Sequence, residues 1–257
     1  MHRLAALLVA ASLAPAAVAQ QAGPVVLELY TSQGCSSCPP ADALFAHLAQ
    51  RDDVIALALH VDYWDYLGWK DAFARPRHTA RQKAYAKAAR SRTIFTPEMI
   101  VQGEDRVKGH DAAAISTEIA AHLRRAPRAA LSVEREGDAI RIDVAPAAHD
   151  PEAPSPIGSP ALAAPSSGAV PASETAGAPA DIHVVRFLPE EEVSIEGGEN
   201  AGQTVTYHNI VTDWQTIGQW DGASSADFVY RNAGDGPVAV IVQGARMGPI
   251  LAAARVP

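Results

Sequence analysis

The sequence predicts an α/β domain followed by an all-β domain. Residues 25–31 (VVLELYT) and 54–60 (VIALALH) are short runs of branched apolar residues, as in buried strands. Between them, residues 41–51 (ADALFAHLAQR) place apolar side chains at helical spacing. From residue 130 onward the pattern changes to short strands separated by Gly, Asn and Asp turns, which is typical of a β-sandwich.

The first domain is expected over residues 22–126. Its strand, helix and second strand form a βαβ unit in which the two strands are parallel. The unit is followed by an amphipathic helix around residues 80–88, a hairpin of MIVQG (99–103) with DRVKG (105–109), and a closing helix over 111–125. The predicted order of elements is therefore β-α-β, one further helix, then β-β-α.

The second domain is expected over residues 129–257. Its predicted strands are LSVEREGDAIRIDV, divided by a Gly137-Asp138 turn, then IHVVRF, TVTYHNIV, WQTIGQW, DFVYR, VAVIVQ and ILAAARV. Residues 145–180 interrupt this series with eight prolines and no Phe, Tyr or Trp, so they bury too little apolar surface to offset their ordering entropy. We expect a disordered loop there, inserted into the β domain.

The N-terminus predicts export from the cytoplasm. Arg3 is followed by the apolar run 4–13 and by Ala17-Val18-Ala19, which has the small side chains of a cleavage site. We expect a signal peptide over residues 1–19 and a periplasmic or secreted product. No later segment is apolar enough for a membrane span, and the expected compartment is oxidising, so a cysteine pair there forms and keeps a disulfide.

The charge of the chain argues against nucleic acid as a partner. The net charge is −8, whereas phosphate contacts require a basic surface. One segment differs, because no acid occurs between Asp71 and Glu98. Within it lie the bases Arg75, Arg77, His78, Arg81, Lys83, Lys87, Arg90 and Arg92, interpreted as a solvated helix face or as a surface that steers acidic partners.

Residues 31–40 (TSQGCSSCPP) contain the two cysteines of the chain, and three interpretations are open. A structural staple that closes so short a loop stabilises by only about 2 kcal/mol. A zinc site needs further ligands, and the histidines lack the spacing of a zinc pair, although Cys35, Cys38 and a distant His could bind copper(I). We therefore expect neither a metal nor another cofactor.

The third interpretation is a redox couple, because CxxC beside a βαβ pattern is a redox motif. It requires Cys35 to be exposed at a helix N-terminus, where unpaired amides favour the thiolate, and Cys38 to be near enough to resolve a mixed disulfide. Ser36 and Ser37 supply no basic side chain to stabilise that thiolate. We expect Cys35 to attack and Cys38 to resolve.

The order of elements resembles the thioredoxin fold. TSQGCSSCPPAD, HVDYWDYLGWKD, FTPEMIVQG and GENAGQTVTYHNIV together resemble a family of secreted bacterial proteins catalogued as domain of unknown function 1223. The resemblance covers nearly all of the mature chain and implies a thioredoxin-like α/β first domain. It further implies that Thr96 and Pro97 lie opposite the cysteines, with a cis peptide bond between them and the backbone of Thr96 pairing with a substrate chain.

The residues after the second strand are expected near Cys35, because the carboxyl ends of parallel strands share one edge. Trp64 is a candidate wall for a substrate peptide, and Asp62 and Asp65 are candidate proton relays. Glu28, in the strand before the cysteines, is a weaker candidate that should face the other way. In the β domain, polar residues expected to pack on the first domain are Glu199, Asn200, Tyr207, His208 and Asn209.

The function predicted from the sequence is thiol–disulfide exchange in the cell envelope. Its partners are protein thiols or disulfides together with a separate electron donor or acceptor. The alternative is a protein without enzymatic activity, either a binding module of the envelope or a copper(I)-handling protein that uses the same cysteines. The sequence leaves that choice open.

Overall fold

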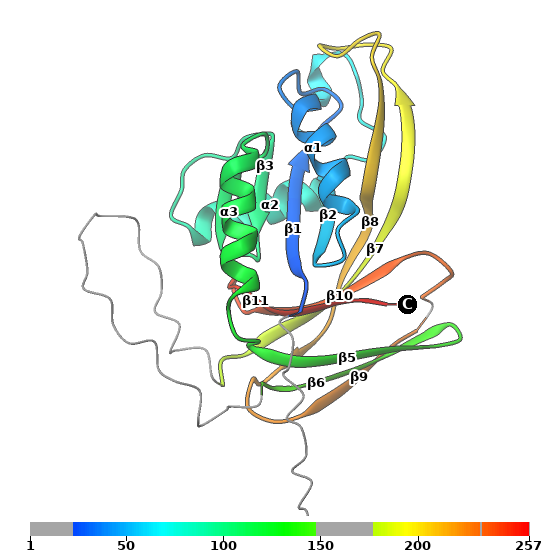
Figure 1. The fold of residues 1–257 in the computed structure, drawn as a ribbon. Helices are drawn as coiled ribbons and strands as arrows, with labels where there is room; N and C mark the ends of the chain where they lie inside the picture. Colours follow the sequence, from blue (N-terminus) through cyan, green and yellow to red (C-terminus); the bar gives the residue numbers. More distant parts are fainter. Residues whose placement is uncertain (1–22, 148–176, 232, 257) are drawn as a thin grey trace, which may run out of the picture.

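The computed structural model describes residues 23–147, 177–231 and 233–256 (Figure 1). The elements are β1 (Val25–Thr31), α1 (Pro39–Ala49), β2 (Val54–His60), the short 3-10 helix η1 (Asp65–Leu67), α2 (Pro76–Ala88), β3 (Glu98–Val101), β4 (Asp105–Lys108), α3 (Ala112–Leu123), β5 (Ala129–Glu136), β6 (Ala139–Pro146), β7 (Ala180–Ser194), β8 (Thr204–Trp220), β9 (Ala226–Arg231), β10 (Val238–Gly244) and β11 (Ile250–Val256). The predicted signal peptide and most of the predicted loop 145–180 lie outside the described residues. None of the described helices is long and apolar enough to cross a membrane.

One mixed sheet runs through both halves of the chain. Its strand order is β11-β10-β7-β8-β2-β1-β3-β4, and a second sheet has the order β5-β6-β9. The expected parallel pairing of β1 with β2 is confirmed, and β8 joins β2 in parallel at Ala58 and Ile210. The predicted fold class, a thioredoxin-like α/β domain followed by a separate all-β sandwich, is therefore wrong, because strands from both regions share the eight-stranded sheet and strands outnumber helices.

The physical cause of this difference is that two expected segments fuse into the long strand β8, and a third is extended into the long strand β7. β8 continues through Thr212 and Asp213, where the sequence suggested a break, and β7 extends beyond the predicted IHVVRF to Ser194. The two strands pair along their length, with register shifts that absorb the irregular positions. Asn209 has φ 46°, and its side-chain amide donates to the carbonyl oxygen of Ala56 at 3.0 Å, which fastens β8 to β2. A turn-forming residue thus serves here to join two strands.

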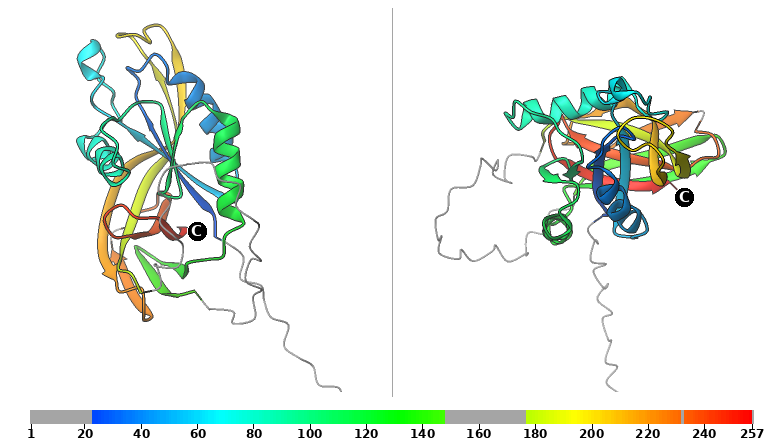
Figure 2. Two further views of the ribbon diagram at one scale, coloured as in Figure 1. Left: turned by 90° about the vertical axis from the view of Figure 1, so that its left-hand side faces the viewer. Right: turned by 90° about the horizontal axis from the view of Figure 1, so that it is seen from above.

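Helices cover the two faces of the large sheet unequally (Figure 2). α1 and α3 lie on one face, where Leu27 of β1 packs with Phe45 and Ile115. α2 lies on the other face, where Tyr85 packs with Tyr30 of β1. This division follows from the alternation of side chains along β1.

The smaller sheet completes the core. Its residues Ile140 and Ile142 pack with Val240 and Val242 of β10 and with Trp220 of β8. Ile241, between those two valines, packs on the face that carries α2. Because side chains alternate along a strand, Val240 and Val242 point to the opposite face, so the smaller sheet covers the same face of the large sheet as α1 and α3. The strands β1, β2 and β10 are thus buried on both faces of the large sheet, and their sequences are mostly apolar.

Candidate functional site

The two cysteines form a disulfide in the connection from β1 to α1. Cys38 is the N-cap of α1, and Pro39 and Pro40 occupy its first turn, where backbone N–H groups need no helical partner. The Cα atoms of Cys35 and Cys38 are 5.4 Å apart, and both residues have an exposed fraction of 0%. The expectation that Cys35 is exposed at the helix tip is therefore wrong for this disulfide form.

Two hydroxyl groups cover the sulfur of Cys35. The Thr96 hydroxyl donates to Cys35 Sγ at 3.2 Å, and Trp64 Nε1–H donates to Thr96 Oγ1 at 2.7 Å. The Ser37 hydroxyl lies 3.5 Å from Cys35 Sγ and 3.4 Å from the Thr96 carbonyl oxygen. The Thr96–Pro97 peptide bond is cis, as the family resemblance implied. The structure therefore brings Thr96 to the disulfide, with Trp64 bonded to Thr96 and Pro97 next to it in the chain.

The hairpin between β7 and β8 holds the cysteine loop from the C-terminal half of the chain. The side-chain amide of Asn200 donates to the carbonyl oxygens of Gln33 and Cys35, both at 2.9 Å. Gly197 lets this hairpin approach the backbone of Gly68 closely, because a Cβ at position 197 would lie 2.8 Å from the carbonyl oxygen of Gly68. The expected packing of polar residues near position 200 on the cysteine region is confirmed for Asn200.

A buried carboxyl group lies one helical turn after Cys38. The backbone N–H of Asp42 donates to the Cys38 carbonyl oxygen at 3.1 Å, so the two side chains share one side of the helix. The Asp42 carboxylate accepts a hydrogen bond from the Thr31 hydroxyl at 2.8 Å and has no ion pair among the residues the structure describes. Burial raises the pKa of Asp42 to about 7, although His60 and the Thr31 hydrogen bond oppose the shift.

His60 and Asp71 form a buried ion pair near Asp42. His60 Nδ1 lies 2.7 Å from Asp71 Oδ2, and both side chains are fully buried. Asp71 Oδ2 also accepts from the backbone N–H of Gln33 at 2.8 Å. Burial acts to raise the pKa of Asp71, but His60 and the hydrogen bonds outweigh it and lower that pKa. His60 Nε2 is buried without a hydrogen-bond partner in the described structure, and the ring of Tyr207 packs against His60 at 4.8 Å.

The carboxylates predicted as relays after β2 have other partners. Asp62 accepts from the Thr79 hydroxyl at 2.6 Å, and Asp65 accepts from the backbone N–H of Asp71 at 3.2 Å. Both therefore organise the connection between β2 and α2. Neither makes a hydrogen bond to a cysteine within residues 23–147, and their role as relays stays a prediction.

Glu28 belongs to a different buried cluster, under α2. Its carboxylate accepts from Arg81 at 2.7 and 2.8 Å, from the Tyr85 hydroxyl at 2.6 Å and from the Tyr30 hydroxyl at 3.0 Å. The Arg81 guanidinium also lies 3.8 Å from the ring centroid of Trp214. Burial acts to raise the pKa of Glu28, but Arg81 and the hydrogen bonds lower it overall. Glu28 is held as a paired carboxylate, and its partner Arg81 joins the two halves of the chain through Trp214 and Gln243.

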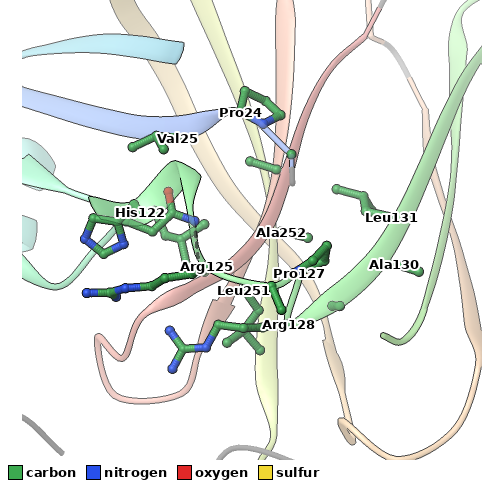
Figure 3. Close-up of a pocket in the computed structure, with 16 residues that line it drawn as sticks. Pro24, Val25, His122, Arg125, Pro127, Arg128, Ala130, Leu131, Leu251 and Ala252 are labelled. Carbon is green, nitrogen blue, oxygen red and sulfur yellow. Dashed lines mark hydrogen bonds between the residues drawn. The ribbon is translucent and has the colours of Figure 1, made fainter. Parts of the chain in front are cut away.

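A cavity of about 200 Å³ lies at the opposite end of β1 from the cysteines (Figure 3). Its polar side chains include His122, Arg125 and Arg128. Glu104, Asp105 and His122 place three potential metal ligands within 4.8 Å of one another. Arg125 and Arg128 already pair with Glu104, and His122 pairs with Asp105, so these groups satisfy one another. The cavity has no contact with the disulfide region.

Sequence reasoning missed Asp42 and Asp71. A signal for Asp42 was present, because the expected helix places it beside Ala41, Phe45 and Leu48 on the apolar face, where a carboxylate is unusual. No comparable signal marks Asp71, which reaches His60 through an irregular segment. Both residues become visible only when β2, α1 and the following loop are assembled.

Comparison with known proteins supports the fold. The model of the family described as "Protein of unknown function (DUF1223)" matches residues 26–159 and 159–243. A crystallised protein of Agrobacterium tumefaciens is 31% identical, with 92% of this chain and 95% of that chain covered and a TM-score of 0.70. HBP35 of Porphyromonas gingivalis is 16% identical over 91% of this chain and 75% of its own, with a TM-score of 0.54, and shares the fold alone. No curated protein is detectably similar.

Proposed function

Since the chain belongs to the DUF1223 family, whose function is unknown, its activity has to be inferred from its site, and we propose that it is a thiol–disulfide oxidoreductase. Cys35 and Cys38 are the exchanging pair. The predicted signal peptide, residues 1–19, supports a periplasmic or secreted location, where partners are protein thiols and disulfides of the envelope. A separate protein supplies or accepts the electrons.

The observation that carries this proposal is the buried carboxyl group of Asp42, one helical turn after Cys38. A structural staple needs no titratable group beside it, and burying an unpaired carboxylate destabilises a fold. A redox pair can use such a group, because the resolving thiol must lose a proton before it attacks. With its pKa raised to about 7, Asp42 can both accept and donate a proton at neutral pH.

The exchange can be written with all atoms balanced. A partner thiolate attacks Cys35 Sγ, which breaks the Cys35–Cys38 bond and leaves a partner–Cys35 mixed disulfide and a Cys38 thiolate. Protonated Asp42 then donates its proton to that thiolate. In the reverse direction Asp42 removes the proton from the Cys38 thiol, and the resulting thiolate attacks Cys35 Sγ and releases the partner as a thiolate.

Access to Cys35 requires the hydroxyl cover to move. Ser37 is exposed and Thr96 is half-buried, so a partner can displace both hydroxyls by side-chain rotation. The backbone of Thr96 then lies beside the attacked sulfur, in position to pair with the partner's chain. Asn200 keeps the cysteine loop fixed during this change, because it binds main-chain carbonyls rather than the sulfur.

The test uses single cysteine variants of the mature chain. In the proposed enzyme, reduced Cys38→Ser accumulates a mixed disulfide with its partner, and Cys35→Ser has no exchange activity. The reduction potential of the pair should lie well above about −300 mV, below which structural disulfides are found. Ser36→Ala serves as a control at an exposed position of the same loop. A potential below that limit, with no captured partner, would identify a staple, and tight copper(I) binding without exchange would identify a metal-handling protein.

A further inference from the structure

Of the three α-helices, α2 alone lies on its face of the large sheet (Figure 2). An open hollow of about 500 Å³ lies beside the C-terminal end of α2. Four cationic side chains line it, and all four are exposed: Lys83, Lys87, Arg90 and Arg92. Within the described parts of the chain, none of the four forms an ion pair or a side-chain hydrogen bond. The hollow is therefore a concentration of uncompensated positive charge.

This charge is unusual for the molecule that carries it. The net charge of the chain is −8, yet no acid occurs between Asp71 and Glu98. Two other bases of the same segment form ion pairs with acids on other strands, because Arg77 pairs with Asp213 and Arg81 pairs with Glu28. The bases that stabilise the fold are thus neutralised, whereas those around the hollow remain available.

Arg90 adds a second observation. The N–H of Ser91 donates to the carbonyl oxygen of Ala86 at 2.8 Å, and the N–H of Arg90 donates to that of Lys87 at 3.0 Å, so α2 ends with Arg90 in the left-handed region at φ 53°. Glycine adopts this conformation at the lowest cost, and an arginine there adds backbone strain. The side chain of Arg90 contributes nothing to closing the helix, and it lines the hollow instead.

The hollow lies within reach of the disulfide. Arg92 is four residues before Thr96, so their Cα atoms are at most about 14 Å apart even in a fully extended chain. Thr96 in turn donates to Cys35 Sγ at 3.2 Å. An extended peptide that pairs with Thr96 can therefore span from the sulfur to the hollow with about four to six residues.

We propose that this hollow docks an acidic stretch of the protein whose thiol or disulfide reacts at Cys35. The inference rests on the proposed function, and it names the class of substrate: a polypeptide with clustered Asp or Glu about four to six residues from its reactive cysteine. Arginine binds carboxylates in a forked geometry, and a rim of like charges raises the association rate of an acidic chain.

The experiment compares two short peptides that each carry one cysteine activated with thionitrobenzoate. One has four glutamates beginning about five residues from the cysteine, and the other has glutamines in their place. The reduced protein attacks the peptide sulfur, thionitrobenzoate leaves as a coloured thiolate, and Cys38 then releases the peptide thiol. We expect the acidic peptide to react at least about tenfold faster at low salt and to lose most of that advantage at high salt.

Variants separate docking from folding. Arg90→Gly removes one charge and relieves the backbone, so it should slow the acidic peptide about two- to fivefold while the urea midpoint stays the same or rises. Lys87→Gln should give a similar loss without changing the reaction of the glutamine peptide. The matched control is Arg124→Gln, an exposed cation at the end of α3, which should leave both reactions unchanged.

A binding measurement distinguishes failure of the inference from failure of the proposed function. The acidic peptide with serine in place of cysteine should bind the protein, as followed by fluorescence anisotropy, and Arg90→Gly should weaken that binding. Binding without exchange by any peptide would refute the oxidoreductase and leave the docking site intact. Equal exchange of the acidic and neutral peptides would refute the docking site alone. Tighter binding of anionic lipid vesicles or single-stranded DNA than of the acidic peptide would also overturn it.

Discussion

Replacing Asp42 with asparagine should change stability in a way that depends on pH. In the oxidised protein, burial raises the pKa of Asp42 to about 7, against about 3.9 for an unfolded aspartate. The folded state therefore holds this proton more tightly. Its contribution to stability is fully present below about pH 4, falls as the pH rises, and is lost above about pH 7. Three pKa units correspond to about 4 kcal/mol, which the wild-type chain forfeits at alkaline pH and Asp42→Asn does not.

The assay is urea unfolding of both oxidised proteins at several pH values between about 4 and 8. Asparagine can keep the hydrogen bond from Thr31, and any cost of the amide itself is the same at every pH. The stability of Asp42→Asn relative to wild type should therefore rise by about 3 to 4 kcal/mol from the lowest pH to the highest. Asp52→Asn, at an exposed position, is the control and should stay within about 0.5 kcal/mol of wild type throughout. A difference between Asp42→Asn and wild type that does not change with pH would refute the assignment of Asp42 as a buried neutral acid.

Three further substitutions test the surroundings of the site. Asn200→Ala removes the hydrogen bond to the buried carbonyl oxygen of Gln33 and one of the two to that of Cys35, which still accepts from the Cys38 N–H, and it should lower the free energy of unfolding by about 1–3 kcal/mol in urea titrations. Arg81→Met strands the buried carboxylate of Glu28 and should cost about 3–5 kcal/mol, part of which Glu28→Gln in the same chain restores; no recovery would argue against their pairing. Trp64→Phe removes the N–H that holds Thr96, so reduction of the disulfide by a small thiol should accelerate severalfold, and an unchanged rate would show that Trp64 is no part of the cover.

The local sequence pattern was sufficient to predict the individual helices, strands and turns. The apolar run of β1, the helical spacing of Leu44, Phe45 and Leu48, and the Gly137-Asp138 turn all predict what the structure contains. These signals depend on neighbours within a few residues. They say nothing about which strands share a sheet.

Long-range pairing is what the sequence did not reveal. The extended β7 and β8 place Asn200 against the cysteine loop, more than 150 residues away along the chain. Two buried polar clusters likewise join distant segments, since Asp71 meets His60 across a loop, and Glu28 meets Arg81, whose side chain also donates to Gln243 on β10. Each contact is between residue types common on surfaces, so their burial is a property of the assembled sheet and not of any local motif.

The shared sheet also bears on how the disulfide can act. Asn200 and Asp71 bind the main chain of the cysteine loop from two sides, whereas the groups that cover Cys35 Sγ are side-chain hydroxyls. A main chain held by buried hydrogen bonds opens only with much of the fold, but a hydroxyl rotates within nanoseconds. The site therefore has a rigid frame and a movable cover, and reduction should proceed without unfolding. Hydrogen exchange can check this separation, because the amides of Gln33 and Asp42 should stay protected under conditions in which a small thiol already reduces the disulfide.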